Sequence, residues 1–552
     1  MAKYVKAIKD FSGGLSEVAN DNIPDNCLVT AKNVVPGDGY GIARASGTNI
    51  AYDPIFVESI PSGENAAGPV VMMIELAIDD ETHIIAATEE ANGSWTLWDR
   101  QYNEIVERYT WTAISDGAHD HAFQINPILS WFYYDEKLFW VDGTAFRYYP
   151  DDEGEINDVP NQYHTGDLDF WAHLQTSISV EEHYGRWFFA TPDNEIIWSE
   201  VGYYDKFITT HVSTILPGVR DSIKALYEFN DSLLIFLERS VYNLSGSDFV
   251  SLSDLTLTKL SVESGTKWPK SIKTISNAVL YLGDNGVYRL NIPYLSSQIA
   301  ATNISQKQAS KRLTAEGIID VYAEVFEGVY YISLRGADSI KEYRYYIDQK
   351  SWWGEYTQQA YCYIPKLTGG DHLYLGCAKG QILYYDSAST NYYNDDGAAV
   401  SIPVEVVTKG YDVVGGTVID SKVKRVFVVL RQYAAESSTF AVQVKTDYLE
   451  GAWEANVDSM HGVVTAVLQD ITGDESLVWS EGLWKAAYWG WIDTVTKMFQ
   501  LNRKCKRIQF KFIDSSQDNP LMIYGVAMLF KKKKAKGSRM GVSSSDRFDF
   551  KN

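Results

Sequence analysis

The feature that most constrains the fold is a strand–turn–strand pattern that recurs along the chain. Residues 277–291, NAVLYLGDNGVYRLN, contain two short runs of β-branched and aromatic residues joined by a Gly-Asp-Asn-Gly turn, which predicts a β-hairpin. The same pattern appears at 137–152, 231–246 and 371–386. Comparable hairpins are spaced by roughly 40 to 50 residues, the period of four-stranded propeller blades. We therefore expect an all-β chain with a β-propeller of about seven blades over residues 68–395.

A propeller also solves the burial problem that such hairpins create. One blade cannot bury both faces of its sheet, whereas blades packed around an axis cover each other and leave only short edges. Aromatic pairs are then expected to fill the gaps between neighbouring sheets, namely Trp352 with Trp353 and Tyr384 with Tyr385. The alternative is a pair of ordinary β-sandwiches built from similar strands.

The sequence pattern changes after residue 395. Apolar and polar residues then alternate over longer strands, as in KVKRVFVVL at 422–430, which is typical of antiparallel strands covered on at least one face. We expect a β-sandwich over 396–533 and a polar C-terminal tail over 534–552.

Residues 1–67 are expected to form an N-terminal arm and the first strands. The stretch SGGLSEVANDNIPDN at 12–26 is polar and rich in turn residues, so we expect it to make no core and to pack against something larger. Residues 10–47 are therefore predicted to run across a blade or a neighbouring subunit. On this interpretation, deleting them abolishes assembly and leaves a folded monomer.

The charge of the chain bears on its partners. A net charge of −23 argues against a broad basic surface for nucleic acid, because phosphate neutralisation needs clustered Lys and Arg. The exception is KKKKAKGSR at 531–539, which is either a solvated tail or a contact with an acidic partner or nucleic acid. The N-terminus lacks the apolar core of a signal peptide, and no apolar run approaches the roughly 20 residues of a membrane span.

Groups with metal-binding or redox chemistry are sparse. DGAHDHAF at 116–123 brings two imidazoles near carboxylates, a donor set for a transition metal, but a glycine-containing loop is more often a solvated polar segment. The residues concerned are Asp116, His119, Asp120 and His121. The segment HTGDLD at 164–169 is interpreted in the same way. Four scattered cysteines lack metal-ligand spacing and are expected to be reduced, partly buried thiols; they are Cys27, Cys362, Cys377 and Cys505.

Catalytic patterns are also weak. SVESGTKW at 261–268 is a degenerate match to the Asp box of sialidase-type propellers, which is a turn device in that family and not the active site. Two pairs of carboxylates are expected in turns, Asp151 with Asp152 and Asp395 with Asp396. Nothing in these turns would give the two members of a pair different pKa values, so acid and base roles cannot be assigned to them. There is neither a Gly-x-Ser-x-Gly elbow nor a Walker phosphate loop. We expect no catalytic, cofactor-binding or metal-binding residues, no cofactor and no enzymatic activity.

The N-terminal segment carries a family resemblance. Residues 10–47 resemble the opening of the tail nozzle, or tail-tube hub, proteins of short-tailed bacteriophages, which include packaged-DNA-stabilisation proteins of the β-propeller type. The segment at 185–207 and the later hairpins continue the pattern in the same order. In nozzle proteins a basic run often ends this N-terminal motif, whereas here the corresponding residues are GIARASG at 41–47, which leaves open what the segment contacts. The matching residues are Gly13, Gly14 and Leu15, then Pro24, Asp25 and Asn26, then Ala31, Asn33 and Val34, then Gly41 and Arg44.

The resemblance implies a structural virion protein of the phage tail. Such proteins form a ring, usually a homohexamer, below the portal and head–tail adaptor, and genomic DNA is retained in and ejected through its channel. The expected partners are other copies of the chain, the adaptor or portal, distal tail or fibre proteins, and duplex DNA without sequence-specific binding. The expected location is the virion tail, after assembly in the host cytoplasm. An acidic channel wall would let DNA slide, although the charge could instead face outward.

A second hypothesis comes from a different class. Exposed tryptophans stack on sugar rings, so the chain could be a carbohydrate-binding or glycan-degrading propeller that acts on the host surface. The candidates are Trp484, Trp489 and Trp491. In a strand, Trp489 and Trp491 would share one face, and core packing explains them equally well. The mass of the native assembly separates the two hypotheses.

Overall fold

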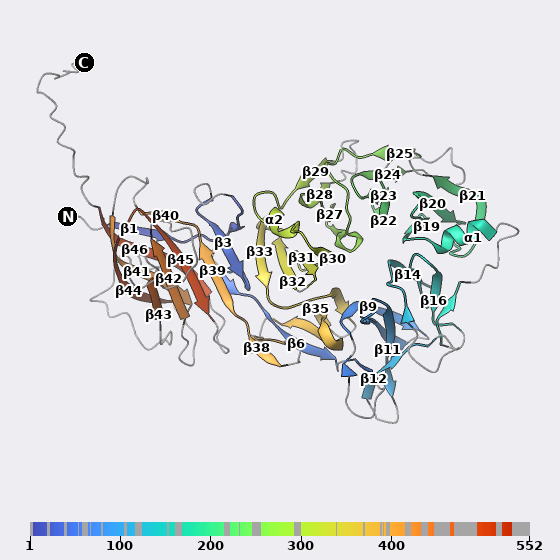
Figure 1. Cartoon of the computed structure of the whole chain (residues 1–552), viewed down its shortest axis with the longest axis horizontal. Coiled ribbons are helices and arrows are strands. Elements are labelled where there is room, and N and C mark those ends of the chain that lie inside the picture. The colour runs from blue at the N-terminus through green and yellow to red at the C-terminus, as the bar shows by residue number, and fades with distance from the viewer. Residues whose placement is uncertain are drawn as a thin grey trace, which may run out of the picture.

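The structure is a computed structural model of the whole chain (Figure 1). The residues that it describes are 4–18, 23–37, 41–52, 55–57, 65–66, 68–78, 81–103, 108–115, 124–151, 154–159, 168–214, 221–230, 232–245, 256–291, 300–337, 339–367, 370–386, 389, 391–393, 398–413, 421–431, 440–446, 464–468, 494–514 and 522–532. Within these ranges, no helix has the length and apolarity needed to cross a membrane.

The fold is all-β, and its larger part is a β-propeller (Figure 1). The described residues form seven four-stranded antiparallel units in chain order, which we number as blades 1 to 7. Blade 1 consists of β9 (Val70–Ile78), β10 (Glu81–Glu89), β11 (Trp95–Asn103) and β12 (Arg108–Ala113), with β13 (Gln124–Ile125) beside β11. Blade 2 consists of β14 (Ser130–Tyr134), β15 (Lys137–Val141), β16 (Phe146–Tyr149) and β17 (Asn157–Asp158). Helix α1 (Leu168–Gln175) leads to blade 3, which consists of β18 (Ser179–His183), β19 (Arg186–Ala190), β20 (Glu195–Ser199) and β21 (Phe207–Thr214).

The next three blades repeat this order. Blade 4 consists of β22 (Ile223–Phe229), β23 (Ser232–Leu237), β24 (Val241–Ser245) and β25 (Thr256–Lys259). After the short helix η4 (Pro269–Ser271), blade 5 consists of β26 (Lys273–Ile275), β27 (Ala278–Gly283), β28 (Gly286–Asn291) and β29 (Ala300–Asn303). After α2 (Ser310–Leu313), blade 6 consists of β30 (Ile318–Phe326), β31 (Val329–Gly336), β32 (Ile340–Tyr346) and β33 (Ser351–Tyr356).

Blade 7 closes the propeller with a strand from the N-terminal region. It consists of β34 (Cys362–Leu367), β35 (Gly370–Gly376), β36 (Ile382–Asp386) and β6 (Gly47–Tyr52), with η5 (Ala378–Gly380) between β35 and β36. Strand β34 contacts β9 of blade 1 and β30 of blade 6, so first strands of successive blades meet near the centre of the ring (Figure 1). The four hairpins predicted from the sequence are confirmed as β27–β28, β15–β16, β23–β24 and β35–β36.

Most of the remaining described strands form a β-sandwich beside blades 6 and 7 (Figure 1). One sheet consists of β4 (Val34–Pro36), β5 (Ile42–Arg44), β46 (Met522–Lys532), β41 (Ser421–Arg431) and β44 (Thr494–Cys505), with β1 (Tyr4–Ile8) against β46. The other continues from β33 of blade 6 through β3 (Cys27–Lys32), β39 (Val404–Thr408), β45 (Arg507–Asp514), β42 (Phe440–Thr446) and β43 (Val464–Leu468). Strands β2 (Gly14–Leu15) and β40 (Tyr411–Asp412) flank this second sheet, and two ribbons pair β37 (Asn391–Tyr393) with β38 (Ala399–Ser401) and β7 (Phe56–Val57) with β8 (Asn65–Ala66).

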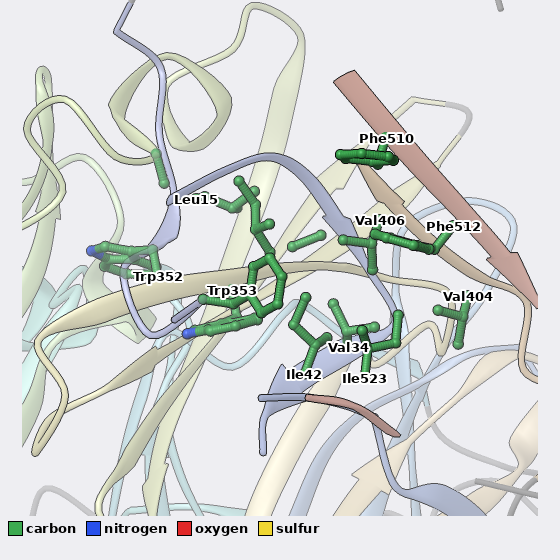
Figure 2. Packing of buried hydrophobic residues seen from close by; sticks show 14 of the residues in the cluster. Leu15, Val34, Ile42, Trp352, Trp353, Val404, Val406, Phe510, Phe512 and Ile523 are labelled. Carbon is green, nitrogen blue, oxygen red and sulfur yellow. The ribbon is translucent and has the colours of Figure 1, made fainter. Parts of the chain in front are cut away.

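The N-terminal arm runs across blade 6, as predicted for residues 10–47, but the expectation that residues 12–26 make no core is wrong, because Leu15 belongs to the core. Phe11, Leu15 and Leu28 are fully buried, and they join a single apolar cluster with side chains of blade 6 and the sandwich. Figure 2 shows Leu15 of this cluster near Trp352 and Trp353. Polar turns alternate with single apolar anchors here, and composition averaged over the stretch hides the anchors. Deleting residues 10–47 would remove core strands, and such a deletion is therefore not expected to leave a folded monomer.

The aromatic pairs lie largely where they were expected. Trp352 and Trp353 are fully buried between blade 6, the arm and the sandwich (Figure 2). Tyr385 of blade 7 stacks on Tyr331 of blade 6, with 5.9 Å between the ring centroids. Tyr384 stacks on His372 of its own blade, with 4.6 Å between the ring centroids, and also packs against an apolar cluster that blades 1 and 7 share. Blade-to-blade packing therefore relies on aromatic side chains at this end of the propeller.

Candidate functional site

The segment that resembles nozzle proteins lies at the junction between propeller and sandwich. Strand β3 pairs with β33 of the propeller on one side and with β39 of the sandwich on the other, and both meet at Ala31. One strand of the arm therefore makes the two domains a continuous sheet.

Asn33 fastens this junction with its side chain. It has a left-handed backbone, with φ of 54°, a conformation that asparagine tolerates better than most residues. Its amide nitrogen donates to Thr357 Oγ1 at 2.6 Å and to the Pro403 carbonyl at 2.7 Å. Its amide oxygen accepts the Thr357 backbone N–H at 2.6 Å. The side chain thus bonds the propeller and the sandwich at once.

Gly14 lets the arm approach blade 6 closely. Its φ is +64°, and a Cβ placed there would lie 2.4 Å from the Trp352 carbonyl oxygen. Leu15 beside it is fully buried against the tryptophans (Figure 2). Further along, the Glu17 carboxylate accepts the backbone N–H groups of Lys311 and Arg312 at 2.8 and 3.0 Å. The arm is therefore anchored to the link between blades 5 and 6.

Arg44 ties the two sheets of the sandwich together. Its guanidinium forms an ion pair with Asp514, and both side chains are almost completely buried. Arg44 belongs to β5 of one sheet and Asp514 ends β45 of the other. A buried ion pair gives little net stability but is costly to break, so it favours one arrangement of the two sheets over others.

A second buried charge pair lies between blades 6 and 7. Arg344 Nε donates to Glu342 Oε1 at 2.8 Å, and the hydroxyls of Tyr363 and Tyr385 both donate to Glu342 Oε2 at 2.6 Å. The Arg344 guanidinium lies 3.8 Å from the ring centroid of Tyr356 and 4.5 Å from that of Tyr385. Burial lowers the pKa of Arg344, but Glu342 and the tyrosines outweigh it and hold this pKa well above its usual range. The cluster is enclosed and serves packing.

The first strands of blades 3 and 4 bring acidic groups together. Burial, together with the neighbouring carboxylates of Glu228 and Glu182, raises the pKa of Glu181 to about 8. The His183 ring lies against the same group, with Nδ1 3.3 Å from Glu228 Oε1. On blades 5 and 6, by contrast, the acidic groups are neutralised: Lys273 Nζ donates to Glu324 Oε2 at 2.6 Å.

Most metal and carboxylate candidates from the sequence lie outside the described residues. This holds for 116–123, for 164–167, and for Asp152, Asp395 and Asp396. Asp151 caps its own turn, because its side chain accepts the Glu155 backbone N–H at 2.8 Å. Within the described ranges, no three His, Cys, Asp or Glu side chains group closely enough to hold a metal ion. The tryptophans proposed for sugar stacking, Trp484, Trp489 and Trp491, also lie outside these ranges.

The Asp-box-like segment at 261–268 is a packed turn. Thr266 is fully buried, and its hydroxyl donates to the Leu282 carbonyl at 2.7 Å while its backbone N–H donates to the Leu237 carbonyl at 2.9 Å. Lys267 projects outward and pairs with Glu238 and Asp284. The segment therefore joins blade 4 to blade 5. The four cysteines are buried and form no disulfide, and burial raises the pKa of Cys27 to about 11.

One polar cluster was missed by sequence reasoning. His83 Nδ1 lies 2.9 Å from Asp99 Oδ2, and Asp99 also accepts the Tyr149 hydroxyl at 3.0 Å. Asp99 is almost fully buried between blades 1 and 2. The only sign of this cluster in the sequence is Asp99 inside TLWDR at 96–100. The apolar residues of this run predict a strand, but they do not indicate which groups the carboxylate contacts.

Comparisons with known proteins show likeness at the level of solved structures alone. No protein-family model matches the sequence, and no curated protein matches it. The extracellular domain of the one-component system BT4673 from B. thetaiotaomicron aligns with 91% of this chain at 10% identity and a TM-score of 0.43. This chain spans 65% of that domain. PorZ, a surface component of the type-IX secretion system of Porphyromonas gingivalis, aligns with 65% of this chain and 43% of its own, at 10% identity and a TM-score of 0.35.

A WD40 domain gives a similar result. The Pan2 WD40 domain of Neurospora crassa aligns over 58% of this chain and 89% of its own, at 11% identity and a TM-score of 0.33. Likenesses of this degree carry no information about activity, substrates or partners. The propeller assignment rests on the strand order and closure described above.

Proposed function

We propose that this chain is a structural component of a phage tail. Copies of it form a nozzle ring below the portal and adaptor, retain and release genomic DNA through the channel, and carry distal tail or fibre proteins. The observation that supports this most is the position of the motif residues shared with nozzle proteins. Gly14 lets the arm pack against blade 6, Asn33 bonds the propeller to the sandwich, and Arg44 ties the two sheets of the sandwich together.

The mechanical reason is that a tail ring must keep its shape while DNA passes. Two domains linked by one flexible connector would move relative to each other, because interfaces between domains of one chain are usually small. Here a shared sheet and the Asn33 hydrogen bonds remove this freedom. A resemblance concentrated on such residues is a resemblance of architecture, as expected for a structural protein and not for an enzyme.

A carbohydrate-binding propeller is the second candidate, and one observation favours it. Trp131 on β14 is 43% exposed, and Tyr133 on the same face is 42% exposed, which suits stacking on sugar rings. On this candidate the protein binds polysaccharide as a monomer, and Trp131→Ala abolishes binding.

The native mass and an electron image of the purified protein test the proposal. We expect a closed ring several times the mass of the 62.2 kDa chain, with an open centre. Virions labelled with antibody against the chain should show it at the tail, below the head. A chain that stays monomeric at all concentrations, and binds or cleaves polysaccharide, would contradict the tail role and support the second candidate.

A further inference from the structure

Charge is strongly segregated along this chain. Residues 51–200 contain 29 Asp and Glu against five Lys and Arg, so this stretch alone accounts for the whole net charge of −23. Residues 501–552 contain 13 Lys and Arg against four Asp and Glu. The first stretch builds blades 1 and 2 and half of blade 3, and the second includes sandwich strands β45 and β46. Figure 1 places the sandwich and blades 2 and 3 at opposite ends of the molecule.

The basic end has a regular geometry. Lys422 on β41 lies directly opposite Lys504 on β44 and opposite Lys531 on β46, so three lysines form a row across adjacent strands on one face. Like charges directly opposite each other destabilise a sheet. Among the described residues, no carboxylate forms an ion pair with any of the three. An arrangement that costs stability in the single chain is explained if an acidic partner neutralises it.

Apolar side chains lie on the same sheet face. Val5 on β1 pairs with Leu529 on β46, two residues from Lys531, and Val5 is 49% exposed. Met498 on β44 pairs with Phe427 and is 43% exposed. We call this surface, with the lysine row, the lysine face. A duplex would use the lysines but not the apolar side chains, so the combination fits a protein surface that is acidic and partly apolar.

Blades 1 to 3 present such a surface on their first turns. Glu81 begins β10, Asp135 and Glu136 form the β14–β15 turn, and Glu182 precedes the β18–β19 turn; all four are exposed. Because each lies in or next to the turn that joins the first and second strands of its blade, these residues share one face of the propeller. Tyr184 and Tyr203 beside them are 50% and 51% exposed. We call these residues the acidic turns.

We propose that the lysine face of one copy docks on the acidic turns of the next copy. The two surfaces complement each other in charge, and both carry exposed apolar side chains. The two surfaces are different parts of the molecule, with the sandwich at one end and blades 2 and 3 at the other (Figure 1), so the contact is head-to-tail. Such contacts close into rings or grow into filaments. This inference rests on the proposed function and identifies the interface of the ring.

Charge reversal on the lysine face is the first test. The variant with Lys422→Glu, Lys504→Glu and Lys531→Glu should lose assembly at least 100-fold in association constant, measured by analytical ultracentrifugation. The matched control reverses three exposed propeller lysines, with Lys259→Glu, Lys307→Glu and Lys350→Glu, and makes the same change in net charge. It should assemble as the wild type does. Circular dichroism and thermal unfolding confirm that both variants are folded.

Charge reversal on the acidic turns gives a rescue. The variant with Glu81→Lys, Glu136→Lys and Glu182→Lys should also fail to assemble alone. A chain that carries both sets of reversals is complementary to itself again and should assemble within threefold of wild type. A structural defect in either set would not be repaired by adding the other.

The outcomes separate the interface from the function. If the variant with the reversed lysine face forms the same ring as the wild type, the proposed interface is wrong and the tail proposal is unaffected. Charge-dependent head-to-tail oligomers that never close into rings support the interface and contradict the nozzle. A wild-type chain that is monomeric at every concentration overturns both.

Discussion

At the scale of single residues, the chain places charges where water cannot reach them. The Glu342–Arg344 pair lies inside a shell of tyrosines that accept the cation on their faces and donate hydroxyls to the carboxylate. Such a pair adds little net stability compared with apolar residues, but removing one member leaves a buried charge alone. We expect it to fix the angle between blades 6 and 7.

Arg344→Leu should therefore be strongly destabilising. Glu342 would stay buried without its cation, at a cost of about 3–5 kcal/mol in the free energy of unfolding. Urea denaturation of the variant and the wild type measures this loss. The control Arg239→Leu, at an exposed position, should change stability by less than about 0.5 kcal/mol. Adding Glu342→Gln to Arg344→Leu should recover part of the loss, and a double variant less stable than Arg344→Leu would contradict the pairing.

Glu181 makes stability depend on pH. Its pKa in the folded chain is raised to about 8 from 4.5, by burial and by Glu228 and Glu182. Between these values the folded state holds a proton that the unfolded state releases. The Glu181 contribution to the free energy of unfolding is therefore fully present below about pH 4.5. It is lost as pH rises from there through about 8, by at most about 1.4 kcal/mol per pH unit.

Glu181→Gln should flatten this dependence. The variant should be more stable than wild type at pH 8 to 9 and nearly equal to it at pH 5, as thermal unfolding across this range would show. Glu182→Gln, at an exposed neighbour, is the control and should change the slope much less. Parallel pH profiles for wild type and Glu181→Gln would mean that Glu181 is ionised in the folded chain.

At the scale of elements, the arm is held by its fit against blade 6. Gly14→Ala forces a Cβ to 2.4 Å from the Trp352 carbonyl and adds left-handed strain. We expect a loss of about 2–4 kcal/mol, of which about 1–2 is backbone strain. Gly93→Ala isolates the strain, since φ is +84° there and a Cβ would meet nothing within 4 Å. Equal losses for the two variants would show that the arm does not press on blade 6.

The same scale shows how far the sequence predicts the fold. The hairpin at 277–291 was predictable because its strands and its turn lie within one short segment, and the structure has β27 and β28 there. The pairing of β6 with β36 joins Thr48 to Tyr385, and no local pattern encodes a partner so distant. Glu342 and Arg344 alternate with tyrosines, a pattern that suggests a solvent-facing side, yet both faces of blade 6 are covered. Their burial depends on the neighbouring blade.

At the scale of the whole molecule, the charge distribution predicts that the folded part of the chain does not bind duplex DNA. A body whose net charge is −23 repels phosphate, and at physiological ionic strength only charges within about 8 Å count. The basic run at 531–539 is the exception, and truncation tests it. Phe530 is buried in β46 opposite Val423, so a stop placed after Lys532 keeps the strand complete, whereas a stop at Phe530 would shorten it.

The truncated chain should show no duplex binding tighter than about 10⁻⁴ M at physiological salt, the weak end of non-specific binding. Fluorescence anisotropy with a labelled duplex measures this. If the full chain binds, the dependence of log K on log salt should be shallower after truncation, by about 0.9 for each phosphate that the removed residues had neutralised. Micromolar affinity that survives the truncation would show that the folded body binds DNA, contrary to the acidic-channel interpretation.

Strand β1 also has a consequence for how the protein is made. Its register partner for Tyr4 is Phe530, and β6 pairs with β36, which is also made hundreds of residues later. At about 5–20 residues per second, a ribosome needs roughly half a minute to two minutes to supply the strand that pairs with β1. Until then the first strands of the nascent chain have unsatisfied edges that other nascent chains could pair with. The protein therefore completes its fold only once β46 has been made, and its yield in a cell should depend on how well chaperones shield the first 50 or so residues.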